Sequence, residues 1–317
     1  MSQDAREKAR QIAAKQSKRG NVAMNRRWIQ LTVLGVVVVI VFVIGFVYIN
    51  GQNNKVPESG PVPASSNEYG GIVLTKDGIV QNSSTRDTRN YKELGDSNAS
   101  YTPSVNGTPQ AGKKLPLGVQ SADEASKNGK PVRVTIFQDY NCVHCHEFED
   151  QYGEELKKQV QEGNIELEIR NLTFLDQNSP TQYSARTANA AYAVANQVSA
   201  DKFLDFQKEL FSHQGTGDLN NQQIADIASK YGANIGSDMN DNKWRSLVDV
   251  VTAESSKNDI GGTPTVFVDG EQYTSNDFTG FLKGKIDAKK NNNNPQQEYK
   301  RIRPQALSLR ANPFYVL

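Results

Sequence analysis

The chain has 317 residues and a formal net charge of +1, and this length allows one or two domains. Basic residues dominate segments 1–28 and 289–317, whereas segment 50–288 is acidic. An acidic body of this size argues against nucleic acid as a partner. The two cysteines, Cys142 and Cys145, belong to one motif and leave no separate disulfide framework.

The N-terminal part of the chain predicts a membrane anchor. Residues 31–49 form an uncharged run of 19 residues, which is long enough to cross a hydrocarbon layer of roughly 30 Å. Because the basic excess precedes this run, residues 1–28 are expected in the cytoplasm and the rest of the chain outside. No small-residue cleavage site follows, so we interpret residues 29–49 as the retained signal anchor of a single-pass cell-membrane protein.

Segment 50–121 is interpreted as an extracytoplasmic linker that contains a short hairpin. Proline, glycine, serine and asparagine dominate residues 50–70, a composition typical of a tether. Residues 71–81 contain two short apolar runs around Lys76-Asp77-Gly78, which predicts a β-hairpin. The polar residues 82–128 are expected to be mostly irregular chain that wraps the domain.

A strand, a sharp turn and a helix are predicted from Val132 onward. A β-branched apolar run ends at a turn that contains Asp139 and Asn141, and a Cys-x-x-Cys pair follows. Apolar residues then recur four apart, as on one stripe of a helix: Phe148, Tyr152, Leu156 and Val160. The cysteine pair is therefore expected at the N-terminus of this helix.

This position favours redox chemistry of the two thiols. The first turn of a helix has unpaired N–H groups and about half a positive charge, which stabilise a thiolate. With Asn141 as the N-cap, Cys142 becomes the first helical residue and the exposed nucleophile. Cys145 lies on the inward stripe as the sheltered resolving thiol, and His144 is expected to stabilise the Cys142 thiolate.

The cysteine pair also admits other interpretations. A zinc site usually has four ligands. Besides carboxylates, the chain offers only the two cysteines and three histidines as zinc ligands, so no metal is expected. Residues 142–146 fit the Cys-x-x-Cys-His pattern of c-type haem attachment, with His146 as an axial ligand and Met239 as the available methionine. An inert structural disulfide is the third alternative.

The downstream elements alternate between strand and helix. Residues 165–172 alternate apolar and charged side chains, which predicts a half-buried strand. Amphipathic helical segments fill residues 181–251, and residues 265–273 predict an antiparallel hairpin. A last helix is expected over residues 278–286, before an Asn-rich and basic tail at 291–317. This order indicates an α/β fold with a mixed sheet.

Two motifs resemble the thioredoxin fold: Cys142-Val143-His144-Cys145 after a strand, and Gly262-Thr263-Pro264 before a later one. The resemblance implies a cis bond between Thr263 and Pro264, in a loop beside the cysteines that binds an extended substrate peptide. The long helical stretch between the two motifs is similar to the DsbA-like branch, in which a helical domain is inserted, here over about residues 178–258. The domain is expected to span residues 122–290.

The expected fold class is therefore α/β: a thioredoxin fold with an inserted helical domain, preceded by one transmembrane helix. Two positions depart from the family pattern. Val143 stands where the DsbA motif has proline, and Ile136 stands where many thioredoxin-fold enzymes have a buried acid. Asp139 is the nearest acid, and it is interpreted either as the group that moves protons between the thiols or as a turn residue.

The resemblance implies a membrane-anchored thiol–disulfide oxidoreductase that needs no cofactor and forms disulfides in reduced secreted proteins. A quinone-linked membrane reoxidase would restore its disulfide. Because His144 before the second cysteine resembles the motifs of oxidants, an oxidase is favoured over a reductase or isomerase. The alternatives from other classes are a haem electron carrier and a binding module that keeps the fold without catalysis.

Overall fold

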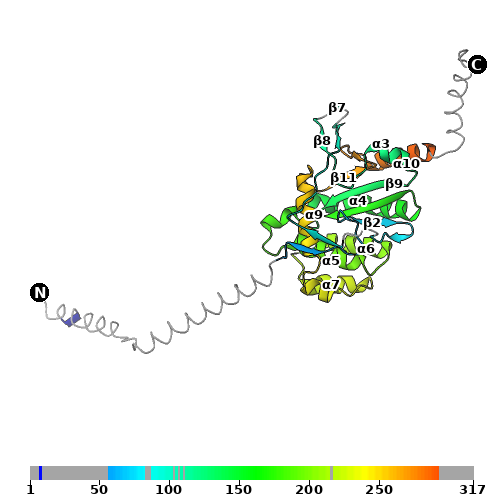
Figure 1. Cartoon of the computed structure of the whole chain (residues 1–317). Helices are drawn as coiled ribbons and strands as arrows, with labels where there is room; N and C mark the ends of the chain where they lie inside the picture. The colour runs from blue at the N-terminus through cyan, green and yellow to red at the C-terminus, as the bar shows by residue number, and fades with distance from the viewer. Residues whose placement is uncertain are drawn as a thin grey trace, which may run out of the picture. The chain divides into compact units, whose positions relative to one another are not determined.

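The computed structural model describes residues 7–8, 56–82, 87–102, 104–105, 108–109, 111–214 and 217–292. The chain divides into two units, Met1–Lys55 and Val56–Leu317, and the second contains the folded domain (Figure 1). The predicted anchor at residues 29–49 lies outside the described residues, as does the tail from residue 293. Within the described ranges, no helix has the length and apolar character needed to cross a membrane.

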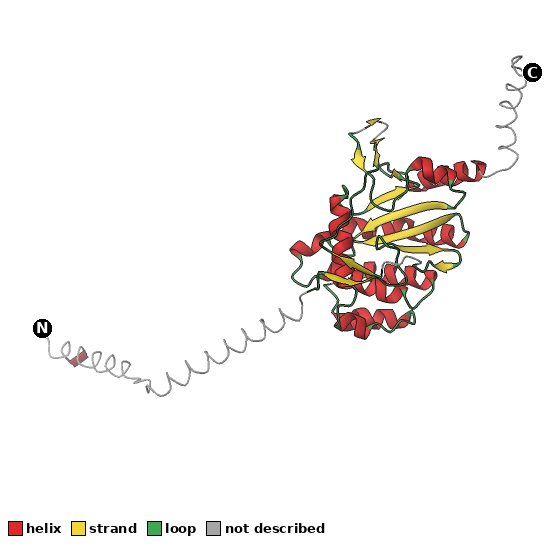
Figure 2. Ribbon diagram, in the orientation of Figure 1, coloured by secondary structure: helices red, strands yellow, loops and turns green. Residues whose placement is uncertain are grey.

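A six-stranded mixed sheet forms the centre of the domain (Figure 2). In spatial order its strands are β12 (Glu271–Gln272), β11 (Thr265–Val268), β9 (Val132–Gln138), β10 (Ile165–Asn171), β2 (Ile72–Thr75) and β3 (Gly78–Ile79). The pair β9–β10 is parallel, and each other neighbouring pair is antiparallel. The predicted strand at 132, the strand at 165 and the two hairpins are confirmed.

The two central strands carry different side chains on their two faces. In the register that pairs Ile165 with Val132, one face is aliphatic along both strands. The opposite face carries Arg133, Glu168 and Arg170, and the last two are 2% and 3% exposed. The strand at 165 was predicted to be half-buried, but both of its faces are covered.

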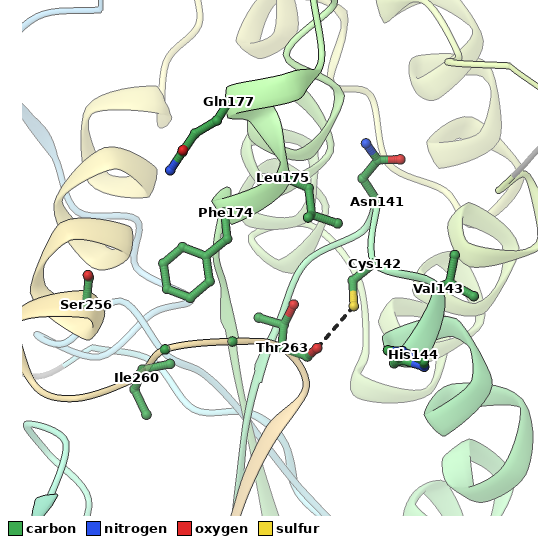
Figure 3. Close-up of a pocket in the computed structure, with 12 residues that line it drawn as sticks. Asn141, Cys142, Val143, His144, Phe174, Leu175, Gln177, Ser256, Ile260 and Thr263 are labelled. Atoms are coloured by element: carbon green, nitrogen blue, oxygen red, sulfur yellow. Dashed lines mark hydrogen bonds between the residues drawn. The ribbon is translucent and has the colours of Figure 1, made fainter.

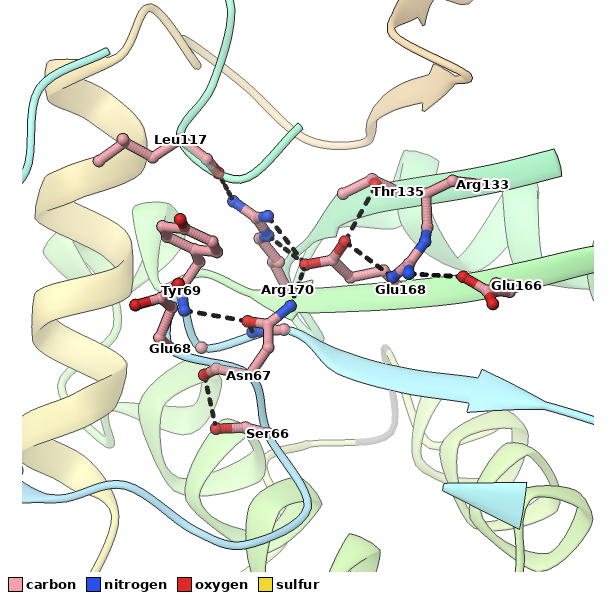
Figure 4. A network of polar contacts seen from close by, with 12 residues as sticks. Ser66, Asn67, Glu68, Tyr69, Leu117, Arg133, Thr135, Glu166, Glu168 and Arg170 are labelled. Carbon is pink, nitrogen blue, oxygen red and sulfur yellow. Dashed lines mark hydrogen bonds and ion pairs between the residues drawn. The ribbon is translucent and has the colours of Figure 1, made fainter. Parts of the chain in front are cut away.

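Ion pairing explains how charges tolerate this burial. The Glu168 carboxylate accepts hydrogen bonds from Arg170 at 2.8 Å and from Asn67 at 2.8 Å, and Arg133 lies 3.4 Å away (Figure 4). Although burial alone would raise the pKa of Glu168, the guanidinium groups of Arg170 and Arg133 hold that pKa below its usual value. A buried charge is stable where partners of this kind satisfy it.

The described residues among 56–120 belong to the domain, and Asn67, Tyr69 and Leu117 from this segment cover the polar face. The segment forms three small pairs of strands: β1 (Ser59–Pro61) with β4 (Thr88–Asn90), β5 (Ser100–Tyr101) with β8 (Lys113–Lys114), and β6 (Ser104–Val105) with β7 (Thr108–Pro109). The sequence predicts a linker here and a domain that begins at residue 122. The wrapping is observed, but β2 and β3 extend the central sheet, because the apolar run at 72–74 pairs with β10.

The helices pack around this sheet. They are α3 (Ala122–Lys127), α4 (Val143–Gln161), the 3-10 helix η1 (Phe174–Asn178), α5 (Tyr183–Ala195), α6 (Ala200–Ser212), α7 (Asn221–Lys230), α8 (Gly236–Asn240), α9 (Arg245–Lys257) and α10 (Phe278–Asn292). In the sequence, helices α5 to α9 lie between β10 and β11, where the helical insertion is predicted. Helices α4 and α10 meet through the rings of Phe148 and Phe278, whose centroids lie 5.1 Å apart.

A buried ion pair joins Arg89, which belongs to the segment before β9, to Glu254 of α9. Arg89 Nη2 lies 2.7 Å from Glu254 Oε1, and this oxygen also accepts the Gly95 N–H at 2.7 Å. We predict that Arg89→Met lowers the free energy of unfolding by about 3–5 kcal/mol, because it leaves the Glu254 carboxylate buried without its cation.

Chemical denaturation measures this loss. The matched control is Lys92→Met, which removes an exposed ion pair with Glu58 and should change stability by less than about 1 kcal/mol. Equal losses in the two variants would contradict the role given to the buried pair.

Candidate active site

The turn between β9 and α4 presents the first cysteine. Helix α4 begins at Val143, and Cys142 is its N-cap, with φ −85° and ψ 117°. The sequence predicts Asn141 as the N-cap, so the helix starts one residue later than expected. The reason is that Cys142 N–H already bonds Asp139 O at 3.0 Å, which keeps residues 139–142 in a turn. An N-cap side chain faces the unpaired N–H groups of the first helical turn.

The Cys142 sulfur lies against the loop that carries Thr263 (Figure 3). Its Sγ donates to the Thr263 carbonyl oxygen at 3.1 Å, and Cys142 is a free thiol that is 7% exposed. A hydrogen bond from the Cys145 thiol is the main cause that lowers the pKa of Cys142 to about 5, against burial, which raises it. The side chain of Thr263 and then the N–H groups of Cys145 and His144 lower this pKa further. A thiol with this pKa is ionised at neutral pH and is a good leaving group.

The second cysteine has the opposite electrostatic environment. Cys145 is a free thiol and only 3% exposed. Burial, and then its interaction with Cys142, raise the pKa of Cys145 far above its usual value. Cys142 was predicted to be exposed, but both cysteines are buried, and Cys142 differs in that it lines the cavity. The two sulfurs still differ in ionisation, as expected for a nucleophile with a low pKa and a resolving thiol that keeps its proton.

The predicted proline loop lies where the resemblance placed it. The Thr263–Pro264 peptide bond is cis, as predicted. Strand β11 follows directly and pairs with β9 in a register that sets Thr265 opposite Phe137. This antiparallel pairing brings the start of β11 to the end of β9. The loop and the turn at residues 139–142, called the cysteine turn from here on, therefore meet at one edge of the sheet.

The His144 imidazole lies at the cavity beside Cys142 and bonds a neighbour on its own helix. Its side chain is 78% exposed, and Nδ1 lies 2.8 Å from Glu147 Oε2. This hydrogen bond, with the charge of Glu147 and then that of Cys142, raises the pKa of His144. Stabilisation of the Cys142 thiolate by the imidazole stays a prediction, and the backbone N–H of His144 is the group that faces the sulfur.

Asp139 acts in this structure as a turn residue. Its buried carboxylate accepts the N–H of Asn141 at 2.8 Å and that of Leu175 at 3.0 Å. Burial raises the pKa of Asp139 to about 6. The carboxylate therefore joins the cysteine turn to η1, a link that the sequence did not indicate.

A cavity of about 610 Å³ opens beside the Cys142 sulfur. Its lining comes from the cysteine turn and the start of α4, from η1, and from the end of α9 and the segment after it: Asn141, Cys142, Val143, His144, Phe174, Leu175, Gln177, Ser256, Ile260, Gly261, Gly262 and Thr263 (Figure 3). The sequence reasoning missed the η1 and α9 members. The η1 residues could have been found, because they follow the carboxyl end of β10, which is parallel to β9 and ends at the same edge.

The residues proposed for a haem have separate partners. His146 Nε2 lies 3.3 Å from Asp150, and its ring stacks on Phe211. The Met239 sulfur is buried in α8 and accepts a hydrogen bond from Asn189 at 3.4 Å. The geometry therefore does not join His146 and Met239 into a pair of axial ligands. Among the described residues, no cluster of three or more histidine, cysteine or acidic side chains could hold a metal ion.

Comparisons with known proteins agree with the motifs. The family model described as thioredoxin matches residues 127–288, just over half of the chain. Similar solved structures include the disulfide bond oxidoreductase DsbG from Mycobacterium tuberculosis, with 27% identity over 49% of this chain and 76% of that one and a TM-score of 0.43. DsbA from Mycobacterium tuberculosis has 26% identity, coverage of 50% and 87%, and a TM-score of 0.44. No curated protein sequence matches the chain.

The ionisation of Cys142 gives a prediction about pH. In the reduced protein, alkylation of Cys142 should increase through a midpoint near pH 5. Because this pKa lies below that of an unfolded thiol, about 8.5, the thiolate stabilises the reduced fold. This contribution to the stability of the reduced protein is complete above about pH 8.5, the pKa of an unfolded thiol, and is lost as the pH falls towards 5.

The Cys145→Ser variant isolates this reaction, because a serine hydroxyl can still donate to the Cys142 sulfur. Cys142→Ser is the control and should remove the acidic titration. A midpoint above pH 8 in the single-thiol variant would contradict the stabilisation of the thiolate.

Proposed function

Since the chain belongs to the thioredoxin family, we propose that it is a thiol–disulfide oxidoreductase that forms disulfide bonds in secreted proteins. The family match confirms the resemblance drawn from its two motifs. One observation carries the proposal: a thiol of low pKa at the start of α4, 3.1 Å from the carbonyl of Thr263, with its buried partner three residues on.

The reaction begins with the Cys142–Cys145 disulfide. A substrate thiolate attacks Cys142 Sγ, a bond forms between these two sulfurs, and the Cys142–Cys145 bond breaks. Cys145 leaves with the electron pair and takes a proton, because burial keeps its pKa high. The second substrate thiolate then attacks the substrate sulfur and releases Cys142 as a thiolate. The substrate is oxidised by two electrons and the enzyme becomes a dithiol.

The low pKa of Cys142 supports the oxidative direction. A thiolate that is stabilised in the dithiol state favours that state over the disulfide, so the disulfide becomes the stronger oxidant. The same property makes Cys142 a good leaving group in the second step. A quinone-linked reoxidase in the membrane is proposed to remove the two electrons. Reductase or isomerase activity remains the alternative within the same chemistry.

The substrate is proposed to bind beside the cis-proline loop. An extended peptide can hydrogen-bond to the backbone of Thr263 as an added strand, which would hold its cysteine next to Cys142. The cavity offers apolar side chains at this place, from Val143, Phe174 and Leu175. Val143 is 61% exposed, and an exposed apolar residue beside a reactive sulfur suits an unfolded chain whose apolar groups are still in water.

The chain is further proposed to be anchored in the cell membrane with its catalytic domain outside. The uncharged run at 31–49 and the basic residues before it support this orientation. An oxidising compartment also suits a disulfide donor, because cytosolic thiols are kept reduced.

Trapping of substrates tests the proposed reaction. The Cys145→Ser variant should accumulate mixed disulfides with exported proteins through Cys142, because the buried thiol that would release them is missing. The captured proteins are identified after reduction. The Cys142→Ser variant is the control and should capture none, while equal capture by both variants, or none by either, would contradict the mechanism.

Protease treatment of intact cells tests the topology. An external protease should digest the domain from residue 56 onward and leave a tag at the N-terminus protected. Digestion of the tag in intact cells, or full protection of the domain when the protease reaches other extracytoplasmic proteins, would contradict the orientation.

A further inference from the structure

Helix α6 of the inserted domain runs along the residues that lead into the active site. Its positions 207 and 211, and position 214 just past its C-cap, follow the i, i+4, i+7 spacing of one helical face. Gln207 and Phe211 are each 1% exposed. This face is therefore buried against the rest of the domain, although the insertion is far from the cysteines in sequence.

Two of these side chains contact the strand end and the turn. Gln207 Oε1 accepts from Gln138 Nε2 at 2.9 Å and from the Tyr140 hydroxyl at 3.3 Å. The ring of Phe211 lies 5.0 Å from that of Tyr140 and stacks on His146 with an interplanar angle of 8°. One helix thus contacts the end of β9, the turn and the first turn of α4.

Gln214 makes the contact closest to the nucleophile. Its Nε2 donates to the carbonyl oxygens of Tyr140 at 2.8 Å and Cys142 at 2.9 Å. A side-chain amide has two N–H donors, so both are used on carbonyls that flank a single residue, Asn141. The position of Gln214 is itself fixed, because its backbone N–H bonds Phe211 O at 3.0 Å in the last tight turn of the helix.

We propose that Gln214 is a positioning residue for the nucleophile, through which the inserted helical domain holds the backbone of residues 140–142. With this backbone held, the Cys142 sulfur stays over the N–H groups of His144 and Cys145 and against Thr263. The inference deepens the proposed function and rests on it, since it assigns the insertion a part in activating Cys142.

Removal of the Gln214 amide has two effects on the pKa of Cys142, and both raise it. The Cys142 carbonyl, which belongs to the same residue as the sulfur, loses a donor that offsets its negative end. The turn also loses two hydrogen bonds, so the sulfur spends less time over the N–H groups that stabilise its charge. Both effects raise the pKa of Cys142, and a shift of about one unit is of the size that one or two hydrogen bonds produce.

The test compares three variants of the reduced full chain by the ultraviolet absorbance of the thiolate as a function of pH. Gln214→Met keeps the length of the side chain and removes both donors. Gln214→Glu has the same shape but is anionic at neutral pH. Gln197→Met is the matched control, because Gln197 Nε2 also bonds two backbone carbonyls, of Ala193 at 3.2 Å and Asn234 at 3.1 Å, outside the residues that line the site.

Gln214→Met should raise the Cys142 pKa by about one unit, and Gln214→Glu should raise it further through its negative charge. Gln197→Met should leave this pKa unchanged even where it lowers stability. An unchanged pKa in Gln214→Met, or an equal shift in Gln197→Met, would overturn the proposal. The readout is the ionisation of one thiol, so it is independent of whether the protein oxidises any substrate.

Discussion

The site depends on one constraint: the sulfur of Cys142 must lie over the N–H groups that open α4 and, at the same time, against the carbonyl of Thr263. The first requirement adds to the acidity that the Cys145 thiol gives the sulfur, and the second places the sulfur against the loop where a peptide is proposed to bind. Strand β9 meets both because it leads into α4 at its end and pairs with β11 along its edge. The central sheet is therefore the frame on which the chemistry is built.

The site consists of the cysteine turn and the loop from Ile260 to Thr263, and each is contacted by a segment that is distant in sequence. The insertion reaches the cysteine turn through α6, as Gln214 contacts the carbonyl of Cys142. The segment before β9 reaches the residues that lead into this loop, because Ser97 N–H bonds the side chain of Asn258 at 2.7 Å and Lys114 N–H bonds that of Asp259 at 2.8 Å. These two residues directly precede the loop from Ile260 to Thr263 that lines the cavity.

Local patterns were sufficient to predict the centre of the fold. The cysteine helix and the strand at 165 each have a short-range signal of periodicity, whereas the cis bond before Pro264 and the insertion were implied by the family resemblance of two motifs. What the sequence missed depends on long-range packing. The charges at Glu168 and Arg170 look like a solvated face until Asn67, Tyr69 and Leu117 cover them. Gln214 has no pattern of its own, because its partners are backbone carbonyls more than seventy positions away.

The most direct test of the account is the reduction potential of the Cys142–Cys145 pair, measured by equilibration with glutathione. If the Cys142 thiolate is stabilised as described, the disulfide is a strong oxidant. The potential should then lie above about −180 mV, the value of protein disulfide isomerase, and towards that of DsbA, about −120 mV. A potential near about −270 mV, that of thioredoxin, would contradict the oxidase and the electrostatic argument that supports it.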